Sequence, residues 1–217
     1  MLRFVLIGLV VGAAVFALWY LLFVRFNHRR GLRVLRWLQG AIADHGQITG
    51  VSWPSAAHFR ARLSLPGSAF HQPFFDVRLA PRHVPVRWAL WSCRQCQETI
   101  TFQANLSCPP GECLEIGRTR WFGLNRHRGQ ESALWPRHTI ATLYISTQPS
   151  WEPQLSGRIN GVVATRDFDF LSVSFRTRPP HFSVSVSLQE TLSHPSGELA
   201  ILECLRELAE GSPTSTM

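Results

Sequence analysis

The sequence contains no lysine, so all 22 of its basic residues are arginines. This absence excludes a phosphate-binding P-loop lysine, a Schiff base with a carbonyl substrate or pyridoxal phosphate, and a lysine general base. The motifs GxSxG, HExxH and GxGxxG are absent as well. The chain therefore carries no signature of a serine hydrolase, a zinc protease or a dinucleotide-binding enzyme, and an enzyme is not the leading interpretation.

Acidic residues are missing from the first 36 positions, which hold six arginines. The remaining 16 arginines stand against 14 acidic residues in the rest of the chain, so most of the net charge of +8 lies at the N-terminal end. A domain with nearly balanced charge offers no strongly basic groove for a polyanion. Nucleic acid is therefore not expected as a partner.

What the sequence does contain is a long apolar run near its N-terminus. No charged residue and no side-chain amide occurs from Phe4 to Val24. As a helix this run is about 31 Å long, which matches the hydrocarbon core of a bilayer at roughly 30 Å. A cleavable signal peptide has a shorter apolar region that ends in a small-x-small site, and neither feature fits here. We therefore interpret residues 1–28 as a transmembrane anchor.

Arginines are concentrated on the C-terminal side of this apolar run. They are Arg25, Arg29, Arg30, Arg33 and Arg36. Because positive residues beside a span stay on the cytoplasmic side, the chain is predicted to be a single-pass cell-membrane protein with its N-terminus outside and its C-terminal domain in the cytoplasm. The same arginines are candidate contacts for the bilayer and its anionic headgroups. Small residues at Gly8, Gly12, Ala13 and Ala17 also permit self-association through the transmembrane helix.

Beyond the apolar run, the periodicity predicts an α+β fold. Residues 29–45 are expected to form a juxtamembrane amphipathic helix, with Leu35, Leu38 and Ile42 on its apolar face. Residues 46–210 are expected to form one soluble domain, in which a largely antiparallel sheet of roughly six to nine strands packs on two helices. The second of these helices is predicted over residues 196–209, and residues 211–217 are expected to be a disordered tail.

Alternation of apolar and polar residues marks the expected strands. They cover residues 58–65, 75–79, 99–106, 114–122, 139–145, 171–175 and 182–188. The clearest signal is in the last of these, where apolar residues and serines alternate. Val184 and the apolar residues two positions on either side of it are predicted to be buried. The serines between them, including Ser185, are predicted to face solvent.

Four of the five cysteines lie in two close pairs. Their spacing, Cys93-x2-Cys96 followed by Cys108-x4-Cys113, resembles that of a zinc ribbon or a pair of zinc knuckles. A zinc site would require the four thiolates to converge tetrahedrally, each about 2.3 Å from the metal. These four residues are therefore candidate zinc ligands, and the alternative is that they are ordinary semi-buried cysteines. An odd total in a reducing compartment argues against a disulfide framework.

The segment Trp88–Cys96 reads Trp-Ala-Leu-Trp-Ser-Cys-Arg-Gln-Cys, which resembles the thioredoxin active-site segment with one inserted residue, Ser92. The resemblance implies thiol–disulfide exchange at Cys93 and Cys96. In thioredoxins a helix N-terminus lowers the pKa of the first thiol. Here residues 97–106 are predicted to form a strand, so that helix is missing.

Three functional interpretations follow in order. The first is a non-enzymatic cytoplasmic domain, tethered to the membrane, that binds an as yet unknown protein partner or serves as a scaffold, with no cofactor. The second is a zinc-stabilised binding module with the same anchor. The third is a thiol–disulfide oxidoreductase.

Overall fold

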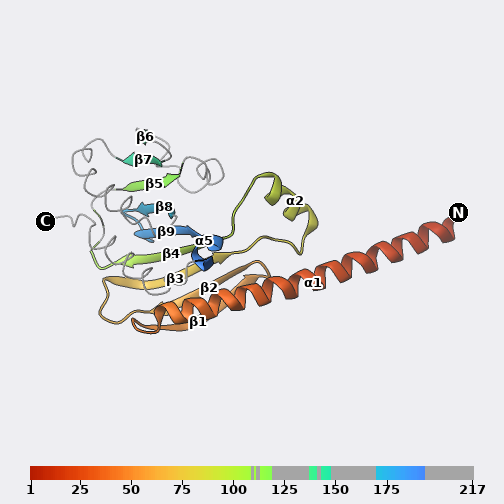
Figure 1. Ribbon diagram of the computed structural model, residues 1–217, viewed down its shortest axis with the longest axis horizontal. Helices are drawn as coiled ribbons and strands as arrows, with labels where there is room; N and C mark the ends of the chain where they lie inside the picture. Colours follow the sequence, from red (N-terminus) through yellow and green to blue (C-terminus); the bar gives the residue numbers. More distant parts are fainter. Residues whose placement is uncertain (109, 111–112, 119–136, 141–142, 148–169, 194–217) are drawn as a thin grey trace.

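The computed structural model describes residues 1–108, 110, 113–118, 137–140, 143–147 and 170–193. The described residues form a long N-terminal helix, a nine-stranded antiparallel sheet and two short helices, arranged as Figure 1 shows. The predicted α+β fold class is confirmed. The helix expected over residues 196–209 and the tail at 211–217 lie outside the described residues.

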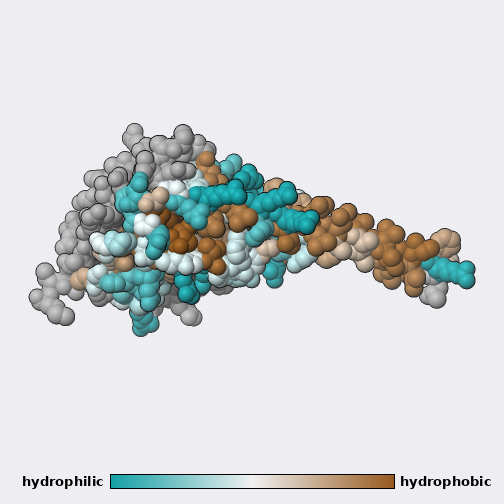
Figure 2. All heavy atoms as spheres, turned by 90° about the horizontal axis from the view of Figure 1, so that it is seen from below, coloured by the Kyte–Doolittle hydropathy of each residue, from teal (hydrophilic) through white to brown (hydrophobic). Residues whose placement is uncertain are grey.

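Helix α1 (Leu2–Ile42) runs without a break for 41 residues, or about 62 Å. It is the one helix among the described residues that is long and apolar enough to cross a membrane, and no residue of its most apolar window is buried. Figure 2 shows this projecting part as hydrophobic apart from its N-terminal tip, with hydrophilic atoms gathered where the helix meets the domain. The anchor and the juxtamembrane helix were predicted as separate segments, but they form one continuous helix.

The second half of α1 belongs to the hydrophobic core. Val34, Leu38, Ala41 and Ile42 are all buried against the sheet. Their spacing of four, three and one residues places them on one side of the helix. The predicted apolar face is correct at Leu38 and Ile42, whereas Leu35 is only partly buried at its margin. The same helix therefore carries the exposed apolar segment and an essential part of the domain's core.

The sheet has the strand order β1-β2-β3-β4-β9-β8-β5-β7-β6, and each neighbouring pair is antiparallel. Its strands are β1 (Gln47–Ser55), β2 (His58–Ser64), β3 (Phe70–Arg78), β4 (Thr99–Leu106), β5 (Leu114–Arg118), β6 (Arg137–Ile140), β7 (Leu143–Thr147), β8 (Phe170–Phe175) and β9 (Phe182–Ser187). The single strand predicted over residues 139–145 is in fact two, because Ile140 pairs with Leu143. Strand β1 was not predicted, since Gly50 and Pro54 interrupt its pattern; as an edge strand it tolerates both.

One face of the sheet is apolar across its central strands. In β4, Phe102 pairs with Phe75 of β3 on one side and with Val184 of β9 on the other. The rings of Phe70, Phe75 and Phe182 lie with their centroids 5.1–6.1 Å from that of Phe102. This aromatic cluster and the buried stripe of α1 belong to one hydrophobic core.

The opposite face of β9 differs from the prediction. Ser185 and Ser187, which were expected to face solvent, are only 6% and 4% exposed. The Ser185 hydroxyl lies 3.0 Å from the hydroxyl of Thr101 on β4, so the two form a buried hydrogen bond. Alternation correctly separates the two sides of the strand, but it does not indicate whether the polar side is covered. Strand β9 is central in the sheet and buried on both faces.

Two short helices flank the sheet. Helix α2 (Pro85–Cys93) begins with a proline, whose missing N–H is not needed in the first turn. Helix α5 (Leu188–Ser193) follows β9 directly, and its first residue is fully buried. Neither helix was predicted from the sequence. Figure 1 shows α2 beyond the end of the sheet, on the side toward which α1 projects.

Candidate functional site: a recess between the long helix and helix α2

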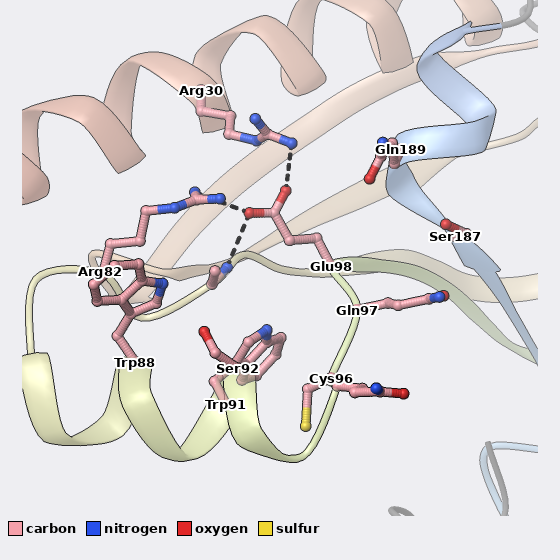
Figure 3. A pocket seen from close by; sticks show the side chains of 12 residues that line it. Arg30, Arg82, Trp88, Trp91, Ser92, Cys96, Gln97, Glu98, Ser187 and Gln189 are labelled. Atoms are coloured by element: carbon pink, nitrogen blue, oxygen red, sulfur yellow. Dashed lines mark hydrogen bonds and ion pairs between the residues drawn. The ribbon is translucent and has the colours of Figure 1, made fainter. Parts of the chain in front are cut away.

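A cavity of about 570 Å³ opens between α1, α2, the start of β4 and the start of α5. We call it the recess (Figure 3). Its lining is mostly polar, with two indole rings added by α2. The residues are Arg30, Ala80, Arg82, Trp88, Trp91, Ser92, Gln95, Cys96, Gln97, Glu98, Ser187 and Gln189.

Glu98 is the centre of the charged network in the recess. Its side chain is 9% exposed, and its two oxygens lie 2.6 Å from Arg30 Nη2 and 3.1 Å from Arg82 Nη1. The backbone N–H of Ala80 donates a third bond, of 3.2 Å, to the same carboxylate. A largely buried carboxylate is stable only when it is paired in this way. With two guanidinium groups against one carboxylate, the recess keeps a net positive charge.

The segment that precedes α2 is fastened to α1 by side chains of the long helix. Asn27, which is fully buried, donates from Nδ2 to the Ala80 carbonyl at 3.1 Å. Trp19 donates from its indole nitrogen to the Arg82 carbonyl, also at 3.1 Å. Trp19, Asn27 and Arg30 lie on one side of α1. Their side chains bind the residues that form the facing side of the recess.

Helix α2 presents two different sides. Trp88, Trp91 and Ser92 are directed into the recess, as Figure 3 shows. Val86 and Leu90 lie on the opposite side of the helix and are 70% and 52% exposed. No residue of α2 is buried. The helix is thus held at its two ends and through the recess, not by burial in the core.

The structure does not bring the four candidate zinc ligands together. Cys93 and Cys96 lie at the α2 end of strand β4, and Cys108 and Cys113 lie beyond its other end. The strand between them is about 24 Å long, roughly ten times a zinc–sulfur bond. All four are free thiols, and the described residues include no group of three or more histidine, cysteine or acidic side chains placed to hold a metal. A four-thiolate zinc site is therefore not formed.

The geometry around Cys93 and Cys96 also differs from that of a thioredoxin. Strand β4 follows the pair as predicted, but a helix, α2, precedes it and ends at Cys93. Cys93 therefore lies at the C-terminal end of a helix, whereas the first cysteine of a thioredoxin lies at a helix N-terminus. Burial raises the pKa of the Cys96 thiol, although the nearby Arg94 guanidinium opposes this. The helix that the thioredoxin resemblance implies after the first cysteine is thus not present at this pair.

The five arginines predicted to meet the membrane surface divide into two groups. Arg25, Arg29, Arg33 and Arg36 are exposed along one side of α1, whereas Arg30 is directed into the recess.

The importance of Glu98 was missed in the sequence, although it is the only acidic residue between positions 77 and 111, a segment with four arginines. Asn27 could have been singled out in the same way, because it is the only residue with a side-chain amide between positions 4 and 36.

A second charged cluster lies on the polar face of the sheet. Asp76, only 1% exposed, accepts bonds of 2.7 Å from both His58 Nε2 and Arg60 Nε, and Arg78 Nε lies 3.3 Å away. Burial alone would raise the pKa of Asp76, but the bonds from His58 and Arg60 and the nearby charges lower it below 3.8. The hydrogen bond of His58 that the structure shows goes to Asp76, and the cluster joins strand β2 to strand β3.

No protein-family model matches this chain, and no curated protein matches its sequence. The fold shows the class of protein to which the chain belongs. It is an α+β protein whose N-terminal helix is long and apolar enough to cross a membrane.

Proposed function

We propose that this chain is a single-pass protein of the cell membrane whose C-terminal domain binds a protein partner on the cytoplasmic side. The observation that carries the proposal is the continuity of α1, whose first half is exposed and apolar and whose second half is part of the core. A flexible linker would let the domain rotate and tilt freely. A continuous helix instead holds the domain at a fixed height above the bilayer, as suits a docking platform.

The orientation is supported by the four exposed arginines of α1. Arg25 follows the apolar run directly, and Arg29, Arg33 and Arg36 continue along the same side of the helix. Near an anionic bilayer surface, each such residue contributes about 1 kcal/mol of attraction. Phospholipid headgroups are therefore a second partner. Self-association through the span is compatible with this arrangement, because the space around Gly8 and Gly12 is open to a second helix.

The recess is the docking site that best fits a protein partner. Tryptophan and arginine are the residues most enriched among those that dominate interface energies, and the recess presents Trp88, Trp91, Arg30 and Arg82 together. Its net positive charge favours an acidic segment of the partner. The described part of the recess holds no nucleophile paired with a base, which supports binding over catalysis.

The topology can be tested with reporters fused after Met217. A reporter that is active only in the cytoplasm is expected to be active, and one that is active only outside the cell to be silent. Changing Arg25, Arg29, Arg33 and Arg36 to glutamine should produce mixed orientations, because the charge bias across the span is then nearly lost. The matched variant with lysine at the same four positions keeps the charge and should retain the original orientation. Reversed reporter activities would contradict the proposal.

Partner binding can be tested by comparing two variants of α2 in the full chain. Trp91→Ala removes an indole from the recess, whereas Leu90→Ala truncates the neighbouring residue on the other side of the helix. Loss of a dominant interface residue costs about 2 kcal/mol or more, or roughly 30-fold in affinity. A specific protein that co-purifies from detergent-extracted membranes with the wild type and with Leu90→Ala should therefore be depleted with Trp91→Ala. Equal recovery with all three chains would show that the recess is not the docking site.

A further inference from the structure

The outer side of helix α2 is an apolar surface that stays exposed in the described part of the chain. At the helical advance of 100° per residue, Val86, Ala89, Leu90 and Cys93 share this side, which we call the outer face. All four residues are exposed. Trp88, Trp91 and Ser92 occupy the opposite side, where they line the recess. Exposed apolar side chains gathered on one side of a helix mark a contact surface.

The position of α2 identifies what this surface meets. The rings of Trp19 and Trp88 lie 6.1 Å apart, and those of Tyr20 and His83 lie 5.8 Å apart. Trp19 and Tyr20 belong to the last turns of the apolar run, where an interfacial level is expected. Because the segment 82–88 contacts these two residues directly, α2 lies at the level at which the span leaves the hydrocarbon core. Figure 1 shows α2 on this side of the domain.

The charges around α2 match a lipid surface. The segment from Leu79 to Gln97 contains three arginines and no acidic residue. Arg87 and Arg94 are exposed at the two ends of α2. An apolar face flanked by basic residues is the composition of helices that lie in the plane of the interface, with the apolar side about 5–10 Å into the headgroup and acyl boundary.

We propose that α2 is a second membrane contact, and that its outer face is embedded among the phospholipids beside the span. This inference deepens the proposed function and rests on α1 crossing the membrane. Two points of contact, α1 and α2, prevent the domain from rotating about the axis of the span. The recess, on the inner side of α2, then opens beside the bilayer in one fixed direction, toward partners that approach along the membrane surface.

The test uses a photoreactive residue in the full chain. The chain is reconstituted in vesicles of phosphatidylcholine and phosphatidylglycerol, with p-benzoylphenylalanine at position 90, at position 92 or at position 21. Illumination inserts the probe into a neighbouring C–H bond, and mass spectrometry measures the lipid adduct. Position 90 replaces Leu90 on the outer face, and position 92 replaces Ser92 on the recess side as the matched control. Position 21 replaces Leu21 within the span and reports on the anchor itself.

We expect strong lipid adducts at positions 21 and 90 and several-fold less at position 92. In vesicles of phosphatidylcholine alone, the adduct at position 90 should decrease while that at position 21 is unchanged, because Arg87 and Arg94 lose their anionic partners. Adduct at position 21 without adduct at position 90, or equal adduct at positions 90 and 92, would overturn the inference and leave the anchor intact. Absence of adduct at position 21 would overturn the proposed anchoring as well.

Discussion

Val184→Asp is expected to unfold the domain. Val184 is 2% exposed, and it lies in the central strand β9 between Phe102 of β4 and Val173 of β8. Moving a carboxylate from water into such a site costs several kcal/mol even after relaxation. The whole stability of a domain of this size is about 5–15 kcal/mol. The substitution therefore removes much or all of the free energy of unfolding.

Thermal unfolding of the full chain in detergent, followed by circular dichroism, would measure this loss. Ser52→Asp is the matched control, because it introduces the same carboxylate at an exposed position of the edge strand β1. We expect the control to melt close to the wild type and Val184→Asp to show no cooperative transition or a far lower midpoint. A Val184→Asp chain as stable as the control would mean that the assigned core is wrong.

The neighbouring residue shows the limit of reading burial from alternation. The sequence predicts that Ser185→Asp is tolerated, because a period of two turns this side chain away from the core. The structure instead indicates that Ser185→Asp destabilises the domain, since Ser185 is buried and its hydroxyl is hydrogen-bonded to Thr101. Both faces of a central strand can be covered, and the serines of β9 keep their polarity because they bond across the sheet. Local pattern identifies the side of a strand, not its environment.

The features that could be predicted are those that depend on nearby residues. Strand β4 was predicted with its observed bounds, because eight residues of β-forming sequence end in clear turn signals. The apolar length of α1 was equally clear, since hydrophobicity over 21 residues does not depend on the rest of the fold. Continuity of α1 was less apparent, because the change from an apolar to a basic composition marks a change of surroundings without any break in the backbone.

The recess could not be predicted because its contacts join distant parts of the sequence. Trp19 and Arg82 are 63 positions apart, and Asn27 and Ala80 are 53 apart. Helix α2 is only nine residues long, too short for periodicity to distinguish it from a loop. The zinc site suggested by the two cysteine pairs shows the converse case, in which residues close in sequence lie far apart in the fold. Spacing along the chain suggested proximity, whereas the strand between Cys96 and Cys108 holds the pairs apart.

Asp76→Asn is expected to destabilise the domain by about 3 kcal/mol at neutral pH, at the lower end of the cost of breaking a buried ion pair. Asp76 is the common acceptor of His58, Arg60 and Arg78. The neutral amide leaves these three side chains without their anionic partner. All three are partly exposed and regain some solvation, which keeps the loss below the upper end of that range. Asp44→Asn, at an exposed carboxylate just beyond α1, is the matched control and should change stability little.

The effect of Asp76→Asn should depend on pH with a defined sign. The pKa of Asp76 is lower in the folded chain than its ordinary value of 3.8. A carboxylate with a lowered pKa contributes stability above its unfolded pKa and loses it as the pH falls through the folded value. The difference in unfolding free energy between wild type and Asp76→Asn, measured by denaturant titration, should therefore be constant near neutral pH and shrink below about pH 4. A difference that stayed constant down to pH 2, or grew, would show that the charge of Asp76 is not what stabilises this face of the sheet.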